Sequence, residues 1–468
     1  MVYPRRAPDS ANRANLAKPG SHRTELQNDY ETEQKCDNRN MSEPFAVRGR
    51  IVTPSSIIVD GAVIIDGDSI VWMGEAPQAQ AAGYGAEVVA APSPTDGRYI
   101  LPGLVDTHCH GGGGNSFPTA TTVEAMMTTV WEHRVHGTTT LVGSLSTASP
   151  EDLRRQGQMM ADLCDAGELD GIHFEGPFLA SGRLGVTGML PGDSPADYSP
   201  TEGLSAQERE ERARAVLGAQ DFSQVQPPNP ALTRELMITT RGHTVSMTLA
   251  PEGKRAIGSG SVAEVLIENR AVPAFGHTLA SAEFMRGAAA WTREKLGLTP
   301  SEKLRCPRYV VTHLFNGMQP FHHRQPGPML ELLADAAGGG CILELIADGE
   351  HVDLSAVRNV FELVGRDSVV FVSDASAATG MPLDESDSTE AEPNLHLVDI
   401  VRRAWKGAGI PLTDAVYCAS VQGARILGQT DIGEIAAGKR ADLLVTDENL
   451  YPLSVYRHGT LVASVPKN

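Results

Sequence analysis

The sequence predicts an α/β protein in which a (β/α)8 barrel is joined to a small β-sandwich domain built from both ends of the chain. Three observations support this fold class. Eight apolar, β-rich runs alternate with helical stretches from about residue 99 onward. Polar side chains collect at the C-terminal ends of these runs, and shorter runs of alternating polarity lie at both ends of the chain. Strands that alternate with helices are typical of a parallel sheet, and eight such units are typical of a closed barrel.

Composition and charge narrow the class of protein. The 468 residues are enough for one large domain with a smaller companion. The formal net charge of −19 argues against nucleic acid or an anionic membrane as the main partner. The six cysteines are scattered without a CxxC pair, as is typical of free thiols in a reducing compartment. Neither a secretory signal nor a membrane-spanning run is evident, so we expect a cytoplasmic protein.

The ends of the chain differ from its middle. Residues 1–43 are polar and rich in Pro, Asn and Ser, so we expect a disordered tail. Residues 44–98 include SIIVDGAVIIDGDSIVWMG, whose Asp-Gly pairs are turn signals, and they form the first part of the predicted β-sandwich. Residues 429–468 have the same character and form its second part. Residues 99–428 between them form the predicted barrel.

Each barrel strand is predicted from an almost continuous apolar run, as expected for strands that are buried on both faces. The runs cover residues 99–110, 138–147, 170–179, 244–252, 271–280, 309–318, 341–351 and 368–380. Helices are predicted over residues 121–136, 150–166, 281–291 and 353–364. Two stretches are longer than a barrel needs, residues 181–240 and 292–308, and the sequence assigns no role to them.

The first run contains the stretch LVDTHCHGGGG, with two histidines that flank a cysteine. Residues two apart on a strand face the same side, so His108 and His110 are expected to point together and Cys109 away from them. Two imidazoles alone do not complete a metal site. Further candidate ligands end the other runs, where barrel active sites are built: they are Glu175, His277, His313 and Asp374.

This set of side chains predicts metal-assisted hydrolysis of a C–N or C–O bond. Imidazole and carboxylate ligands suit zinc and similar divalent ions. Zinc lowers the pKa of a bound water to about 7, which supplies a hydroxide for attack on a carbonyl. Asp374 can take the proton of that water and pass it to the leaving amine. Taken singly, each residue also has a structural explanation, as a core histidine or a capping carboxylate; their joint occurrence at strand ends favours the metal.

Several motifs point to a known family. They are LPGLVDTHCHGGGG, GIHFEGPF, MTLAPE, FGHT, THLFNGMQPFHHRQPG, ADGEH, SDASAATGMP and GEIAAGKRADLLVTD. Through these motifs, about residues 48–463 of the chain resemble the amidohydrolase superfamily and, within it, the N-acetylglucosamine-6-phosphate deacetylases. The resemblance implies a metal-dependent hydrolase barrel. It also implies release of acetate from N-acetylglucosamine 6-phosphate to give glucosamine 6-phosphate, in amino-sugar catabolism.

The resemblance also implies roles for single residues. Glu175, His277 and His313 match the ligands of the metal site that is always present in the family. His108 and His110 match a pair that can hold a second metal, so one or two ions are expected, with zinc as the first choice. Asp374 matches the catalytic acid and base, and it is also a candidate metal ligand.

Substrate contacts follow from the same motifs. Asn316 and Gly317 match the pair that contacts the sugar phosphate, and Arg324 and His351 match the phosphate anchors. Arg324 lies in a basic HHR patch of an otherwise acidic chain, and a guanidinium suits a phosphate. A partner subunit contributes phosphate contacts in family members, which implies a homodimer.

The sequence departs from the family at two places. Thr187 stands where a substrate-contacting histidine is usual, and only PLDESDSTEAEPNLH separates ATGM from the next predicted helix. The substrate is therefore less constrained than the reaction. The alternatives are a deacetylase of N-acetylgalactosamine 6-phosphate or another N-acyl amine, and a non-catalytic barrel that binds a sugar phosphate or a partner.

Overall fold

The computed structural model describes residues 43–91, 97–180, 223–381 and 395–464. Two compact units divide the chain, Met1–Pro44 and Phe45–Asn468, and every element below belongs to the second unit. The predicted disordered tail falls outside the described residues except for its last position, residue 43. Thr187 and the short segment after Met381 also lie outside them.

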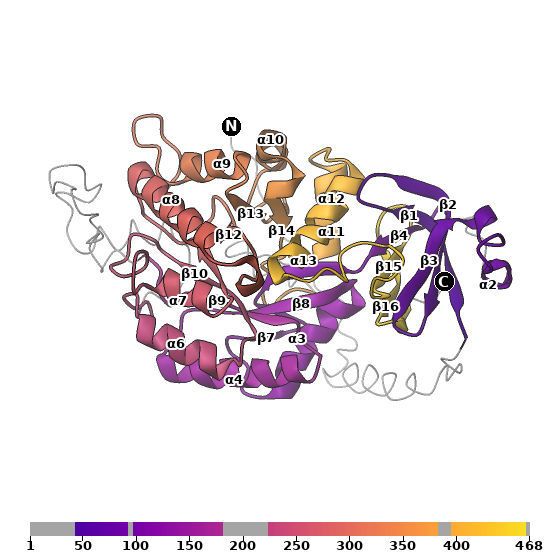
Figure 1. Cartoon of the computed structure of the whole chain (residues 1–468), viewed down its shortest axis with the longest axis horizontal. Coiled ribbons are helices and arrows are strands. Elements are labelled where there is room, and N and C mark those ends of the chain that lie inside the picture. The colour runs from indigo at the N-terminus through magenta and orange to yellow at the C-terminus, as the bar shows by residue number, and fades with distance from the viewer. Residues whose placement is uncertain (1–42, 92–96, 181–222, 382–394, 465–468) are drawn as a thin grey trace, which may run out of the picture. The chain divides into compact units, whose positions relative to one another are not determined.

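Eight parallel strands form the main sheet, in the chain order expected of a (β/α)8 barrel (Figure 1). The strands are β5 (Leu104–Cys109), β8 (Thr138–Leu145), β9 (Gly171–Glu175), β10 (Thr244–Leu249), β11 (Val272–Phe275), β12 (Tyr309–Val311), β13 (Cys341–Leu345) and β14 (Val369–Phe371). Every residue in them is buried, which explains their continuous apolar runs. The first and last strands meet just beyond β14, where the Asp374 N–H donates to the His108 carbonyl at 2.9 Å. The predicted barrel is confirmed.

Helices follow the strands and surround them (Figure 1). They are α3 (Val123–Val135), α4 (Pro150–Asp165), α6 (Pro230–Thr239), α7 (Val262–Glu268), α8 (Ala282–Leu298), α9 (Met329–Ala337), α10 (Leu354–Val364), α11 (Leu397–Lys406), α12 (Leu412–Cys418) and α13 (Val421–Leu427). The start of α4 shows the local logic: the Ser149 hydroxyl accepts from the Asp152 N–H at 3.1 Å, and Pro150 occupies the first helical position. The four helices predicted from the sequence are all present. The third of them, α8, extends to Leu298 and so takes up part of the unassigned stretch 292–308.

The two ends of the second unit build a seven-stranded sheet of their own. Its strands, in spatial order, are β17 (Thr460–Ser464), β16 (Pro452–Arg457), β15 (Leu443–Thr446), β4 (Tyr99–Pro102), β1 (Phe45–Val52), β2 (Ile57–Asp66) and β3 (Ser69–Glu75). This sheet folds back on itself, because the Ile70 N–H donates to the Lys439 carbonyl at 2.8 Å and Ile70 accepts from the Gly438 N–H at 2.8 Å. A separate apolar core, with Val63, Ile100 and Leu443 among its members, fills the fold, as expected of a sandwich.

The first predicted barrel run, residues 99–110, proves to be two strands in two sheets. Residues 99–102, assigned to the barrel from the sequence, pair instead with β1 and β15 in the seven-stranded sheet. Gly103 makes the crossing possible, because a Cβ there would lie 2.8 Å from Thr139 Cγ2 and 2.9 Å from Asp442 Cβ. Its N–H donates to the Asp442 carbonyl at 2.9 Å, and the next residue begins the barrel.

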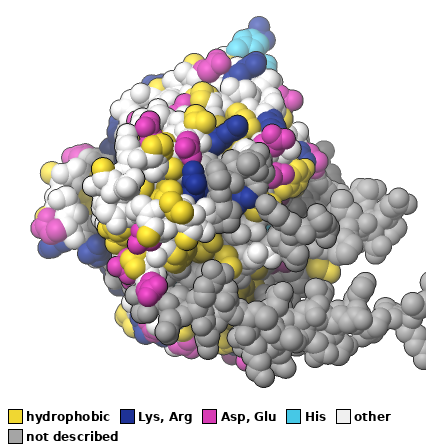
Figure 2. All heavy atoms as spheres, turned by 90° about the vertical axis from the view of Figure 1, so that its right-hand side faces the viewer, with side chains coloured by type: hydrophobic (Ala, Val, Ile, Leu, Met, Phe, Trp, Pro, Cys, Tyr) yellow, Lys and Arg dark blue, Asp and Glu magenta, His cyan; other side chains and the backbone are white. Residues whose placement is uncertain are grey.

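The remaining elements are short: α2 (Gly85–Ala90), the 3-10 turns η1 (Ala76–Gln78), η2 (Ser301–Lys303) and η3 (Arg366–Ser368), and the hairpin of β6 (Gly111–Gly112) and β7 (Asn115–Ser116). Figure 2 shows one face of the molecule, on which acidic and basic side chains are interspersed among hydrophobic ones. None of the helices that the structure describes has the length and apolar character needed to cross a membrane.

Candidate metal centre and active site

The candidate ligands lie at the C-terminal ends of the barrel strands, as predicted. Glu175 ends β9, and His108 lies in β5 with His110 just beyond it. His277, His313 and Asp374 follow β11, β12 and β14, and their φ angles are 45°, 28° and 47°. A non-glycine residue in this region costs on the order of 1–3 kcal/mol and persists only where its surroundings enforce it. Such strain at three neighbouring loop starts is typical of a functional site.

Glu175, His277 and His313 form one buried group. Glu175 Oε1 lies 2.8 Å from His277 Nε2 and 2.8 Å from His313 Nε2, and the two nitrogens are 3.0 Å apart. The two imidazole rings are almost perpendicular, at 88°. A metal ion lies in the plane of each imidazole that binds it, and two perpendicular planes can meet at one ion. The donor set and its geometry therefore fit a divalent metal.

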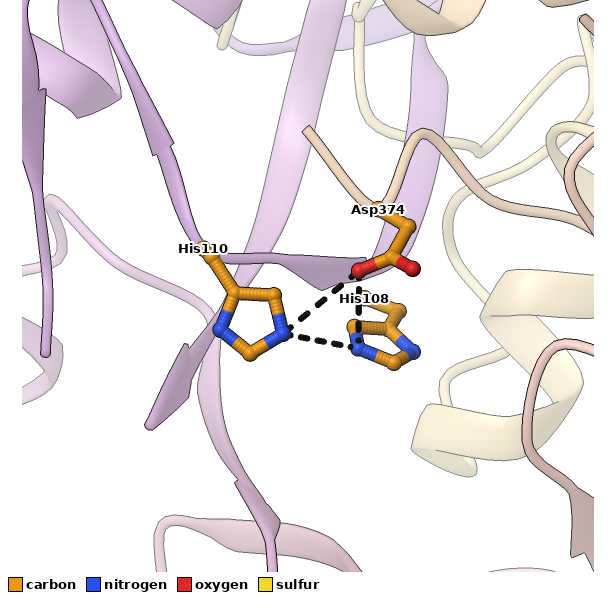
Figure 3. Close-up of side chains that lie close together, drawn as sticks. All are labelled: His108, His110 and Asp374. Carbon is orange, nitrogen blue, oxygen red and sulfur yellow. Dashed lines mark hydrogen bonds and ion pairs between the residues drawn. The ribbon is translucent and has the colours of Figure 1, made fainter. Parts of the chain in front are cut away.

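His108, His110 and Asp374 form a second group beside the first (Figure 3). The Nε2 atoms of the two histidines are 3.1 Å apart, so the pair faces one side as predicted. Asp374 Oδ1 lies 3.2 Å from His108 Nε2 and 3.5 Å from His110 Nε2. Cys109 points away, with its Sγ 3.2 Å from His133 Nε2.

Glu175 joins the two groups into one site. Its Oε2 lies 3.2 Å from His110 Nε2, while its Oε1 contacts the first group. Burial alone would raise the pKa of Glu175, but His277, His110 and His313 outweigh it and hold this pKa well below its usual range. Burial would lower the pKa of His313, but its contact with Glu175 raises it to about 9. The Glu175 carboxylate is therefore kept ionised, as a ligand for a cation must be.

Two buried polar residues that the sequence did not single out, Glu344 and His173, support the candidate ligands. Glu344 on β13 accepts from His108 Nδ1 at 3.0 Å and from the His313 N–H at 3.2 Å. The Nδ1 contact leaves His108 Nε2 facing His110 and Asp374, as carboxylates commonly arrange for metal-binding histidines. His173 bonds Ser144 and Thr248 and packs its ring 4.4 Å from that of His108. The sequence feature that could have identified Glu344 is its charge, because a charged residue is unusual inside a strand predicted to be buried on both faces.

The candidate substrate residues are placed as follows. Asn316 and Gly317 lie in the turn after His313, and the Asn316 N–H donates to the His313 carbonyl at 2.9 Å. Gly317 has a φ of 61°, and a Cβ there would lie 2.6 Å from His277 Nδ1, so only glycine fits. His351 is partly buried after β13, with its Nδ1 2.6 Å from Asp348 Oδ2. Arg324 is exposed in the segment before α9.

A third cluster, Glu132, His136 and His396, does not fit a metal. The rings of His136 and His396 are stacked, with centroids 3.6 Å apart and planes 15° apart. One ion cannot lie in two nearly parallel planes that are separated in this way. In addition, His136 Nδ1 bonds the Glu132 carbonyl at 2.7 Å, which occupies one of its two possible ligand atoms. His396 Nε2 and Glu132 Oε1, 2.9 Å apart, form an ion pair between α11 and α3 instead.

The barrel and its histidine and carboxylate centre agree with the comparison with known families. Residues 99–464 match the model of the Amidohydrolase family. The chain belongs to this family, which places it among the metal-dependent hydrolases.

Individual relatives share more than the fold. The N-acetylglucosamine-6-phosphate deacetylase of Lysinibacillus sphaericus is 26% identical, over 81% of this chain and 89% of the relative. The N-acetylgalactosamine-6-phosphate deacetylase of a Shewanella species is 24% identical, over 78% of this chain and 83% of the relative. A solved structure of a variant N-acetyl-D-glucosamine-6-phosphate deacetylase from Mycobacterium smegmatis, in complex with N-acetyl-D-glucosamine-6-phosphate, is 30% identical with a TM-score of 0.68. The match covers 90% of this chain and all of that one.

Proposed function

We propose that the protein hydrolyses the N-acetyl group of N-acetylglucosamine 6-phosphate, giving glucosamine 6-phosphate and acetate, as a step of amino-sugar catabolism. One observation carries this proposal: six side chains of a hydrolase family converge at the open end of the barrel, with Asp374 Oδ1 3.2 Å from His108 Nε2. The relatives named above support the substrate.

We propose zinc as the metal, held by Glu175, His277 and His313, with His108 and His110 available for a second ion. A divalent ion held there is a Lewis acid that lowers the pKa of water to about 7. Asp374 takes the proton of the attacking water on its carboxylate. The water oxygen bonds to the acetyl carbon, the C–N bond breaks, and Asp374 returns the proton to the leaving nitrogen. Its side chain is 17% exposed, so substrate can reach it.

The substrate grip belongs to the same proposal. Asn316 and Gly317 would contact the sugar phosphate, and Arg324 and His351 would anchor the phosphate. Thr187 is a further candidate contact, in a segment outside the described residues. A homodimer and a cytoplasmic location complete the proposal; the five described cysteines are all free, in keeping with a reducing compartment.

The test is acetate release from N-acetylglucosamine 6-phosphate by zinc-loaded protein, with Asp374→Asn as the control. The variant cannot accept the proton, so we expect a loss of roughly 10²–10⁴-fold in kcat. Sedimentation of the same sample measures the oligomeric state. Folded, zinc-loaded wild-type protein that releases no acetate would contradict the substrate assignment.

A second candidate function is deacetylation of N-acetylgalactosamine 6-phosphate, favoured by the Shewanella relative. The two sugars differ only in the orientation of the hydroxyl at C4, so the chemistry at Asp374 would be the same. Comparing kcat/KM for both phosphates and for an unphosphorylated N-acetyl sugar decides between them. Tight binding of a sugar phosphate without turnover would indicate the non-catalytic alternative.

A further inference from the structure

We propose that Glu252 is a positioning residue that fixes the metal ligand His277 and joins its segment to the Asn316–Gly317 turn. Glu252 lies three residues after β10, and it is 6% exposed. It is a buried acid that the hydrolytic steps do not use, and it contacts the chain directly after His277.

Both carboxylate oxygens of Glu252 are used. Oε2 accepts from the Thr278 hydroxyl at 2.6 Å, and Oε1 accepts from the Leu279 N–H at 2.7 Å. The Thr278 hydroxyl oxygen in turn accepts from the Ala280 N–H at 3.1 Å. Three successive residues after His277 are therefore held, directly or through Thr278, by one side chain from the loop that follows the neighbouring strand β10.

The bonded segment continues to the candidate substrate turn. The Thr278 N–H donates to the Gly317 carbonyl at 3.0 Å, and Thr278 and Met318 form a parallel bridge. Gly317 packs directly against the His277 ring, since a Cβ there would lie 2.6 Å from His277 Nδ1. Glu252 thus holds the segment that directly follows His277 and, through Thr278, joins this segment to the turn that covers the His277 ring.

His277 needs such support. Its φ of 45° is unfavourable for a histidine, and this backbone stays in place only if its neighbours hold it. The other side is held as well, because the His277 carbonyl accepts from the Ala180 N–H at 2.9 Å. Without Glu252, the buried Thr278 hydroxyl and the partly buried Leu279 N–H lose their acceptors, and the segment would move to find others.

The conservative variant Glu252→Gln separates positioning from proton transfer. Its amide oxygen can accept from the Leu279 N–H, and its NH2 group can donate to the Thr278 hydroxyl oxygen. A positioning residue therefore tolerates glutamine but not alanine. If Glu252 instead exchanged a proton during the reaction, the alanine and glutamine variants would lose the same activity, because neither side chain can exchange that proton.

The first readout is zinc affinity, measured in the full-length protein by competition with a chelator. Loss of a side chain that orients a metal ligand typically weakens binding 10–100-fold, so we expect that loss for Glu252→Ala. Glu252→Gln should stay close to wild type, and Thr278→Val should fall between, because the Leu279 bond remains. Asp170→Ala is the matched control: it removes a largely buried carboxylate that binds the Leu141 N–H at 2.9 Å, before the start of β9.

Wild-type zinc affinity in Glu252→Ala, or equal losses in the alanine and glutamine variants, would overturn the proposal. If Glu252→Ala does not fold, an unchanged zinc affinity in Thr278→Val overturns it equally. The second readout, KM for N-acetylglucosamine 6-phosphate at saturating zinc, rests on the proposed function, and we expect it to rise in Glu252→Ala. If wild-type protein releases no acetate but Glu252→Ala still loses zinc, the substrate proposal fails and this one stands.

Discussion

At the candidate metal centre, close contacts between residues restrict which side chains can be accommodated. Gly317 is the sharpest case, because both its φ of 61° and the His277 ring beside it exclude a side chain. Gly327 has the same φ of 61°, but a Cβ there would meet nothing closer than the Gln319 carbonyl oxygen at 3.3 Å. Substituting each glycine in turn therefore distinguishes the effect of backbone strain, which both share, from the effect of a steric clash with His277, which only Gly317 would have.

We expect both Gly317→Ala and Gly327→Ala to lose about 1 kcal/mol of unfolding free energy, because alanine is unfavourable at positive φ. Only Gly317→Ala should also weaken zinc binding, since the new methyl group pushes the His277 ring. Urea unfolding and chelator competition measure the two effects. Equal zinc affinities in the two variants would show that the His277 ring adjusts without cost.

Glu344 is the second residue whose contacts make a clear prediction. Glu344→Leu leaves His108 Nδ1 and the His313 N–H without their acceptor, and each loss costs about 1–3 kcal/mol. Both bonds end on Glu344 Oε2. Glu344→Gln can keep an amide oxygen at that position, so we expect it to weaken zinc binding much less than Glu344→Leu. Calorimetry of zinc binding checks both variants, and a leucine variant that binds zinc as wild type does would refute the role.

At the scale of elements, α3 and α11 are joined by His396. Its Nε2 lies 2.9 Å from Glu132 Oε1 on α3, and its backbone N–H donates to Asp399 Oδ2 at 3.2 Å in the first turn of α11. Burial alone would lower the pKa of His396, but the bonds to Asp399 and Glu132 outweigh it and raise this pKa. Burial would raise the pKa of Asp399, yet His396 and Arg402 lower it to about 2.

Because of these two pKa shifts, the contacts of His396 stabilise the fold only over a limited range of pH. A histidine with a raised pKa stabilises the fold fully below its unfolded pKa, about 6.5, and less as the pH rises through the folded value. An aspartate with a lowered pKa stabilises it above about 3.9 and loses this effect as the pH falls toward 2. We therefore expect His396→Gln to lower the melting temperature clearly at pH 6 and less at pH 9. His243→Gln, at an exposed pair with Asp165, is the control and should change little at either pH.

Some of these elements could be predicted from the sequence and others could not. Continuous apolar runs predicted all eight barrel strands, since burial on both faces leaves a mark in each run by itself. The division at Gly103 left no such mark, because its cause is the approach of Thr139 and Asp442 from distant parts of the chain. The candidate site followed the same rule, because each candidate ligand could be placed at a strand end from the sequence alone. Glu344 stood out only as a charged residue inside a predicted buried strand. The contacts of Glu344 and Glu252 were not predictable, because their partners come from other parts of the chain at no fixed spacing.

At the scale of the whole second unit, two arginines join the seven-stranded sheet to the barrel. Arg457 on β16 donates to the Thr139 carbonyl at 3.0 Å and to the Gly167 carbonyl at 2.7 Å, and its side chain is only 12% exposed. Arg440 donates to the Thr140 hydroxyl at 2.8 Å. The bonds to Thr139 and Thr140 lie at the N-terminal end of β8, whereas the candidate metal ligands lie at the C-terminal ends of the barrel strands.

We expect Arg457→Met to destabilise the protein by about 2–4 kcal/mol, because two charge-assisted bonds to carbonyls are lost. Zinc affinity and kcat should not change, since the metal ligands lie at the opposite ends of the strands. Unfolding in urea, followed by circular dichroism, should remain one transition at a lower midpoint. Two separate transitions would mean that the sheet and the barrel unfold independently.

The place of β4 in the seven-stranded sheet has a consequence for the life of the chain on the ribosome. One edge of β4 pairs with β1, which is made before it, and the other pairs with β15, which is made after the entire barrel. Until then, β4 presents an open, apolar edge that other chains can join. The time of synthesis between these two strands is thus the interval in which aggregation competes with folding, and a truncation before β15 makes that interval permanent.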